Sequence, residues 1–559
     1  MKKKIIMLTV LLAIMLSITC GFAFAEAIQE SPAQTAARAE QNVRAKYIFL
    51  FIGDGTSIPQ INATEMYLAG LDAPVNLTNA LAREEGKFPS GNGVADFTPA
   101  IKRLVFSGFP AHGISTTYSA NSLITDSSSS ATAISTGNKT RDGVVGMDAA
   151  AQKPFTSIAK QLQAKGYKVG VVSTVSLDHA TPAAFYANEV HRNNYYNIAL
   201  QAASSGYDFF GGGGFLAELS KNKNGGSNPK DGVDYTKDIM SVFAEAGYTV
   251  HRDRARFDSI KNGDTKVLAI NPVLDSAQAI PYRIDQERSD ASGGPKQIHF
   301  EEFVGKAIET LDNPNGFFLM SECGKIDWAC HANDAVAVIN DVQTMDLAVR
   351  EALKFYEKHP DETLIVITGD HETGGMTLGF AGTHYDAFLK KLQNQKGSFD
   401  AFNAIIAEQK KANPNITLAD FMPTISDFFG LYRYSADEYA ALDAQAKQGD
   451  AAAFEKIGMA LKDYEYADIE KAFAETFTSD MATASSTDEG YLLYGGYEPL
   501  TVTLTHIMGE KAGISFTTYS HTGLPTPVFA IGAGAEQFDG WYDNTDIYKK
   551  MAAISGVDK

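Results

Sequence analysis

The chain has 559 residues, 44% of them hydrophobic, which allows one large domain with insertions or two to four smaller domains. Its formal net charge is −19, and this becomes −22 without the three lysines of residues 1–25, a stretch that contains no acid. Such a surface repels nucleic acid and anionic membranes. An anionic substrate would need local positive charge, for which bound metal ions are the obvious source.

Residues 1–25 have the pattern of a signal peptide. Three lysines precede an apolar run that ends near residue 18, and Ala23-Phe24-Ala25 follows as a small-residue cleavage sequence. The apolar run is short and is soon followed by polar residues, which disfavours a spanning helix, with an uncleaved anchor as the alternative. We expect cleavage after Ala25 and a periplasmic or secreted mature chain without a stable membrane span.

Five short runs of apolar, β-branched or aromatic residues indicate buried strands. They span residues 47–52, 168–173, 317–320, 363–368 and 527–531. Helix-like stretches, such as 154–164 and 335–359, lie between several of them. This βαβ alternation predicts an α/β fold with a mostly parallel central sheet.

Polar clusters follow four of these predicted strands. Asp54 follows the first strand, residues 178–181 follow the second, Glu322 follows the third, and Asp370 with His371 follows the fourth. Ligands bind at the carboxyl ends of strands in open α/β sheets, so the sequence predicts that these clusters form one site.

Residues 385–495 do not continue this alternation. The segment is rich in Ala, Lys, Gln, Asp and Glu with helical spacing, which indicates an inserted, largely helical cap. Two alternatives stay open, a role in covering the substrate and a helical decoration far from the site.

The segment from Ser321 to His331 combines carboxylates and an imidazole. Asp327 and His331 are four residues apart, so on a helix they share one face and suit a common metal ion. The pair Asp370-His371 precedes a Gly-rich turn, and His521 lies near the C terminus. Mixed Asp and His ligands favour zinc, whereas an all-oxygen set favours magnesium.

Ser127 is a candidate nucleophile at the start of a Ser-rich run. A helix that opens there would direct backbone N–H groups and its positive dipole end at a phosphoryl group on Ser127. No Gly-x-Ser-x-Gly elbow surrounds this serine, so metal coordination is the plausible activator. Taken alone, the run also fits an ordinary helix N-cap.

Two cysteines, Cys323 and Cys330, remain in the mature chain and exclude a disulfide-rich scaffold. Three interpretations stay open: buried thiols, a disulfide closing a short loop, or metal ligands. Oxygen and nitrogen ligands nearby are already sufficient for a metal site, which disfavours the last.

Taken together, the motifs resemble the alkaline phosphatase family from about Tyr47 to Gly534. In chain order they are Gly53-Asp54-Gly55, Thr125-Asp126-Ser127, His179-Ala180-Thr181-Pro182, Arg192, Glu322 through His331, Gly369-Asp370-His371 and His521-Thr522-Gly523. The resemblance implies the α/β fold of that family, with helices on both faces of the sheet. It also implies a catalytic core at 46–384 and 496–559, a flexible segment at 26–45 and a crown-like insertion at 385–495.

The resemblance implies two Zn²⁺ ions and one Mg²⁺ ion. The first zinc would be held by Asp327, His331 and His521, and the second by Asp54, Asp370 and His371. Asp54 would also reach the third site, together with Thr181 and Glu322. Two metals about 4 Å apart can bind the attacking and leaving oxygens of an in-line displacement.

The same resemblance implies hydrolysis of phosphate monoesters, with a broad substrate range and an alkaline pH optimum. Ser127 would form a phosphoserine that water then hydrolyses. Arg192 would hold two phosphate oxygens through its planar fork, and Asp126 would orient Arg192. Relatives are commonly homodimers, which makes a homodimer the expected state.

Two positions depart from the best-known bacterial pattern, which has aspartate at His179 and lysine at Trp328. Other members of the family carry His and Trp there. His179 leaves the identity of the third metal open. Having Trp328 in place of lysine removes a positive charge near the phosphate, which would weaken retention of the product. The alternative for Trp328 is a simple packing role beside the site.

Three rival functions are weighed against this interpretation. A sulfatase of the same superfamily would need Cys/Ser-x-Pro-x-Arg, and the run after Ser127 lacks both the Pro and the Arg. A phosphodiesterase is harder to exclude, although Arg192 suits the doubly charged phosphate of a monoester. A non-catalytic exported phosphate-binding protein is disfavoured by the intact Ser127.

Overall fold

The computed structural model describes residues 44–71, 101–219, 230, 232–384, 386–479 and 481–557. The predicted signal peptide and most of the predicted segment 26–45 lie outside the described residues. Within those described ranges, no helix has both the length and the apolar character needed to cross a membrane.

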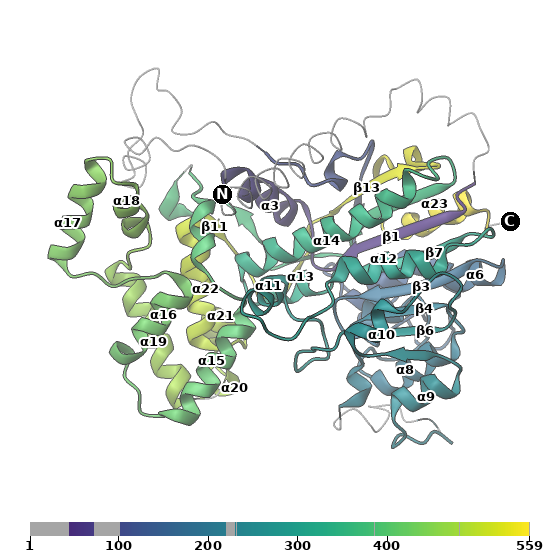
Figure 1. Cartoon of the computed structure of the whole chain (residues 1–559), viewed down its shortest axis with the longest axis horizontal. Coiled ribbons are helices and arrows are strands. Elements are labelled where there is room, and N and C mark those ends of the chain that lie inside the picture. The colour runs from purple at the N-terminus through teal and green to yellow at the C-terminus, as the bar shows by residue number, and fades with distance from the viewer. Residues whose placement is uncertain are drawn as a thin grey trace, which may run out of the picture.

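A ten-stranded sheet forms the centre of the larger lobe (Figure 1). Its strand order is β14-β2-β13-β8-β1-β7-β3-β4-β6-β5. The strands are β1 (Tyr47–Gly53), β2 (Ala111–Thr116), β3 (Lys168–Ser173), β4 (Phe209–Gly212), β5 (Thr249–His251), β6 (Val267–Ile270), β7 (Phe317–Glu322), β8 (Thr363–Gly369), β13 (Thr526–Gly532) and β14 (Gly540–Asp543). Every pairing is parallel except those of β13, which is antiparallel to β8 and β2. The predicted mostly parallel sheet is confirmed.

The five predicted strands are β1, β3, β7, β8 and β13. The sequence did not reveal the other five, which lie toward the two edges of the sheet. Strand β4 reads Phe-Phe-Gly-Gly, and β2 alternates buried with more exposed residues. Such short or alternating strands lack the continuous apolar run that marks a strand buried on both faces.

Helices cover both faces of the sheet, as β1 illustrates. Its residues 47, 49 and 51 belong to one core cluster, and residues 48, 50 and 52 belong to the other, because successive side chains of a strand point to opposite faces. The first cluster includes α12 (Phe300–Leu311) and α14 (Ala335–Tyr356). The second includes α5 (Ser127–Thr136), α6 (Ile158–Ala164), α8 (Tyr195–Ser204), α9 (Ile239–Glu245) and α23 (Thr545–Ser555). Shorter or peripheral helices are α3 (Ile58–Gly70), α7 (Ala180–Ala183), α10 (Arg254–Asp258), α11 (Arg283–Ala291) and α13 (Lys325–His331).

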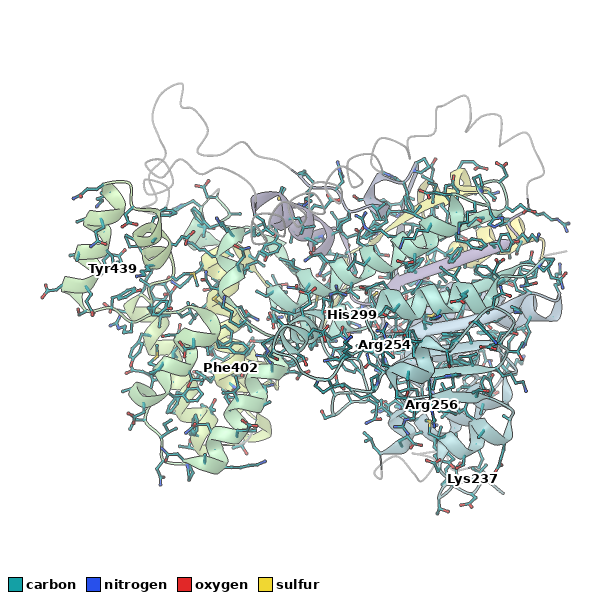
Figure 2. The ribbon with its side chains drawn as sticks, viewed as in Figure 1. Lys237, Arg254, Arg256, His299, Phe402 and Tyr439 are labelled. Carbon is teal, nitrogen blue, oxygen red and sulfur yellow. The ribbon has the colours of Figure 1, made fainter. Side chains whose placement is uncertain are left out.

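A second, helical lobe stands beside the sheet (Figure 1). It contains α15 (Phe399–Ala412), α16 (Leu418–Phe429), α17 (Ala436–Lys447), α18 (Ala451–Gly458), α19 (Asp463–Thr478), α20 (Met481–Ala484) and α21 (Asp488–Tyr494), with α22 (Pro499–Ala512) packed against them. Phe402, labelled in Figure 2, is fully buried there and contacts the rings of Phe421, Phe428 and Phe429. The lobe therefore has its own aromatic core. The boundaries 385 and 495, and the cap role, stay predictions.

Candidate active site

The candidate ligands lie where the central strands end. Strand β1 ends at Gly53 and is followed by Asp54, while β7 ends on Glu322 itself. Strand β8 ends at Gly369 and is followed by Asp370 and His371. Since β1 is paired in parallel with both β7 and β8, these side chains converge at one edge of the sheet. The sheet thus brings together residues that are more than 300 positions apart in the chain.

The first group consists of Asp327, His331 and His521. Asp327 and His331 lie on α13, and their Oδ2 and Nε2 atoms are 3.3 Å apart. The two Nε2 atoms of His331 and His521 are 3.2 Å apart. Nδ1 of His331 donates to the carbonyl of Tyr519 at 2.6 Å, and Nδ1 of His521 donates to that of Thr125 at 2.8 Å. Because a carbonyl only accepts, Nδ1 of each ring carries a proton, and in the neutral imidazole Nε2 keeps the lone pair with which it can bind a metal ion.

The second group consists of Asp54, Asp370 and His371, all buried. His371 Nε2 lies 3.3 Å from Asp54 Oδ1 and 3.2 Å from Asp370 Oδ2. Ser127 Oγ lies 3.2 Å from the same Nε2 atom. The candidate nucleophile is therefore next to this group.

The third group consists of Asp54, His179 and Glu322. Thr181, at the start of α7, donates its hydroxyl to Asp54 Oδ2 at 3.1 Å. Ser173, the last residue of β3, donates to Glu322 Oε2 at 2.5 Å. His179, predicted only as a neighbour of the third site, lies within the group.

Several buried polar atoms in these groups have no hydrogen-bond partner among the described residues. They are Asp54 Oδ1, Asp370 Oδ2, Glu322 Oε1 and His179 Nδ1. A buried polar atom without a partner is costly, and cations bound in the second and third groups would compensate for the missing partners. The donor sets also suit metals, with mixed carboxylate and imidazole in each group. The residues present therefore fit bound metal ions in all three groups.

The packed carboxylates repel one another. Burial raises the pKa of Asp54, and the neighbouring Asp370, Asp327 and Glu322 raise it further. Burial likewise raises the pKa of Asp370, and it raises the pKa of Glu322 to about 7. Cations at the site would remove this repulsion and return the carboxylates to their charged form.

The metal-free protein should become less stable as the pH rises from about 4.5 to about 7. The unfolded chain loses the Glu322 proton near pH 4.5, whereas the folded chain keeps it to about pH 7. Over that interval the unfolded state binds fewer protons, so the free energy of unfolding falls with pH. Urea unfolding of chelated protein at several pH values tests this. A constant or rising free energy of unfolding over the same interval would contradict it.

The environment of Ser127 is set by the first turn of α5. The helix begins at Ser127 and Asp126 is its N-cap, with the Asp126 carboxylate accepting from the backbone N–H of Ser129 at 2.9 Å. Arg192 donates to the other Asp126 oxygen at 3.0 Å. Burial by itself would raise the pKa of Asp126, but Arg192 and the serine hydrogen bonds hold it well below its usual value. Asp126 therefore stays ionised and holds the Arg192 guanidinium at the residue that precedes Ser127.

Trp328 and the cysteines also lie on or near α13. The Trp328 ring contacts that of His179 edge to face, with 5.7 Å between centroids. Cys323 and Cys330 are both buried and not joined to each other. Of the three open interpretations, the structure matches buried thiols.

Sequence reasoning missed the residues that support the ligands. Thr373 donates to Asp327 Oδ1 at 2.5 Å, which links the first group to the strand that follows His371. Glu372 accepts from Gln60 at 2.8 Å and from the hydroxyl of Thr522, the neighbour of His521. Glu372 stands in the Asp-His-Glu-Thr run, but its partners come from distant segments. Only the pairing of β9 (Glu372–Thr373) with β12 (His521–Thr522) reveals this support.

Comparisons with known proteins agree with this geometry. The alkaline phosphatase family model matches residues 45–557. An alkaline phosphatase of Schizosaccharomyces pombe is 32% identical over 80% of this chain and 74% of its own length, and alkaline phosphatase 3 of Bacillus subtilis is 27% identical over 77% and 76%. The solved structure of a cold-active alkaline phosphatase from a psychrophilic Shewanella species is 25% identical, with a TM-score of 0.62 over 91% of this chain and 99% of that one. The chain therefore belongs to the alkaline phosphatase family, whose members are metal-dependent phosphomonoester hydrolases.

Proposed function

We propose that the chain hydrolyses phosphate monoesters by a two-metal in-line displacement, with Ser127 as the nucleophile that forms a phosphoserine. We also propose a broad substrate range and an alkaline pH optimum. The observation that carries this proposal is the position of Ser127 Oγ, at the N-terminus of α5 and 3.2 Å from His371 Nε2. A serine in that position faces both a ligand group and the positive end of a helix.

The proposed cofactors are two Zn²⁺ and one Mg²⁺. The Asp327 group and the Asp370 group would each hold zinc, and the Glu322 group would hold magnesium. The imidazole of His179 leaves room for a different metal in the third group. When bound, the metals supply the charge that lowers the pKa of the Ser127 hydroxyl and stabilises the departing oxygen.

The chain's own residues then divide the reaction between them. Ser127 Oγ attacks phosphorus while the alcohol leaves on the opposite side, and water later attacks the phosphoserine along the same line. Two such displacements give net retention at phosphorus. Arg192 binds two non-bridging oxygens, and Asp126 keeps its guanidinium in place at 3.0 Å. The N–H groups at the start of α5 add further donors.

Turnover of a nitrophenyl monoester and its bis-ester at pH 8 to 10 separates the candidate functions. We expect monoester turnover that disappears with chelator and returns with zinc and magnesium. A preference for the bis-ester would support a phosphodiesterase. Phosphate binding without any turnover by metal-replete protein would support a binding protein.

Trp328→Lys should tighten inhibition by inorganic phosphate. Trp328 occupies the position where the best-known bacterial pattern has lysine, and a lysine there would add a positive charge near the bound phosphate. The inhibition constant for phosphate, measured with the nitrophenyl monoester, should fall, while Trp328→Phe should not lower it. An unchanged constant in Trp328→Lys would undermine the view that Trp328 weakens product retention.

The remaining proposals concern location and assembly. Small phosphate esters are the substrates of the family, and the net negative charge of the chain disfavours nucleic acid. We propose export through the signal peptide, followed by a periplasmic or secreted homodimer. The helical lobe reaches the site through Tyr519, whose hydroxyl donates to the Leu493 carbonyl of α21 and whose carbonyl accepts from His331. That contact supports a role of the lobe in covering the substrate rather than a decoration far from the site.

A further inference from the structure

Lys325, the first residue of α13, holds a buried positive charge between two aromatic rings. Its side chain is 1% exposed, and its Nζ lies 3.8 Å from the ring centroid of Tyr282 and 4.8 Å from that of Trp328. The same Nζ donates to Asp275 Oδ2 at 2.7 Å and lies 4.0 Å from Asp400 Oδ2. The ammonium group is thus enclosed by two aromatic faces and paired with a carboxylate.

This arrangement is anchored on three separate parts of the fold. Asp275 lies in the loop after β6, where its Oδ1 accepts from the backbone N–H groups of Ala277 and Ala279 at 2.8 and 2.9 Å. Tyr282 precedes α11 and is fully buried. Asp400 belongs to the first turn of α15 in the helical lobe. A cation over an aromatic face attracts the ring, so Lys325 ties the indole of Trp328 to both lobes.

Trp328 in turn contacts a residue of the third group, His179. Its ring meets that of His179 edge to face at 74°, and the buried Nδ1 of His179 has no hydrogen-bond partner within the part of the chain that the structure describes. In the metal-free chain, packing against Trp328 therefore helps to set the orientation of the His179 ring. His179 is one of the three residues of the group with Asp54 and Glu322.

We propose that Lys325 is a positioning residue for the third site. Held by Asp275 and Tyr282, its ammonium fixes the Trp328 indole, which in turn fixes the His179 imidazole toward Asp54 and Glu322. This inference rests on the proposed function in so far as the third group binds a metal. It assigns a role to a lysine that touches neither the substrate nor any of the ligand groups.

Two readouts test the proposal in full-length mature protein. The chain has only two tryptophans, and Trp541 is exposed on β14 at the sheet edge, so Trp541→Phe leaves Trp328 as the sole indole reporter. In that background, Lys325→Met should shift the emission of Trp328 and increase its quenching by acrylamide, even without metal. Titration of the two-zinc enzyme with Mg²⁺ alone should show about 10- to 100-fold weaker binding, the usual effect of losing an outer support of a ligand.

Rescue and epistasis distinguish positioning from general damage to the fold. Lys325→Arg keeps the cation and should restore most of the Mg²⁺ affinity. Asp275→Asn keeps an oxygen for the two backbone donors but removes the charged partner of Lys325, and should weaken Mg²⁺ binding in the same direction. It replaces Lys325→Met if that variant fails to fold. Once Trp328→Phe is present, Lys325→Met should add little further loss.

Unchanged Mg²⁺ affinity in a folded Lys325→Met protein would overturn the positioning role while leaving the proposed function intact. An additional loss of the same size in the Trp328→Phe background would overturn the path through Trp328. Failure of the parent protein to bind a third metal ion, tested with both Mg²⁺ and Zn²⁺, would overturn the third-site assignment, and with it this proposal.

Discussion

Replacing Ser127 with alanine should lower kcat for a nitrophenyl monoester by about 10⁴- to 10⁶-fold, the range seen when an enzyme loses its nucleophile. The reason is that no other described hydroxyl takes the same place beside His371 Nε2, at 3.2 Å. The variant retains every aspartate, glutamate and histidine of the three ligand groups, so it should keep its metals. Acid quenching with labelled phosphate should trap a phosphoserine in the wild type and none in the variant.

Ser135→Ala is the matched control for this variant. Ser135 lies on the same helix, is fully buried, and donates its hydroxyl to the Ala184 carbonyl at 2.9 Å, away from the ligand groups. Its loss should affect stability by about 1 kcal/mol and leave kcat nearly unchanged. A Ser127→Ala enzyme that retained kcat within tenfold of the wild type would rule out Ser127 as the nucleophile.

Asp54→Asn should lower kcat/KM by roughly 10³-fold or more, because several kcal/mol of transition-state stabilisation depend on the metals. Asp54 is the one residue shared by the second and third groups. Its loss should therefore reduce metal content by more than one ion per chain after equilibrium dialysis. Elemental analysis of the dialysed protein provides the measurement.

Asp54→Asn should also change the free energy of unfolding, and the direction of the change should differ between the chelated and the metal-replete protein. Burial and the neighbouring carboxylates raise the pKa of Asp54, so removing its charge should stabilise the chelated protein at pH 8. With metals present the order should reverse, because a tightly bound ion stabilises the wild type by about 4 kcal/mol at 1,000 times its dissociation constant. A variant less stable than wild type by the same amount with and without chelator would argue against a metal at Asp54.

Asp341→Asn is the control for neutralising a buried aspartate. Asp341 lies on α14, and burial raises its pKa to about 7, yet it belongs to none of the three groups. This substitution should change stability in the same direction for chelated and metal-replete protein, and metal content should stay the same.

The sequence predicted the sheet and the ligand positions better than it predicted their surroundings. The five apolar runs were recognisable because both faces of those strands are buried, and the side chains after β1, β3, β7 and β8 fall at one edge through the parallel pairing. The assignment of particular carboxylates and histidines to the same metal ion came from the family resemblance. His179 illustrates the limit, since its place in the third group follows from the turn before α7 and not from any local pattern.

The supporting residues could not be predicted because their partners are remote in sequence. Thr373 and Asp327 are 46 positions apart, and Glu372 and Thr522 are 150 apart. The contacts of Lys325 depend on the loop after β6 and on the helical lobe, both of which gave only weak sequence signals. Hydrogen bonds and aromatic contacts of this kind have no periodicity and become visible only when the chain is folded.

The placement of β13 has a consequence for the order in which the molecule assembles. This strand comes from residues 526–532, yet it lies inside the sheet between β8 and β2. Strands β2 and β8 do not pair with each other, because β13 lies between them. His521 lies just before β13 in the sequence, so both are synthesised after the rest of the sheet except β14. The site therefore cannot be completed until the last tenth of the chain has emerged and inserted, a late step of high contact order. Activity therefore requires residues 521–532 to be in place, however early the rest of the sheet forms.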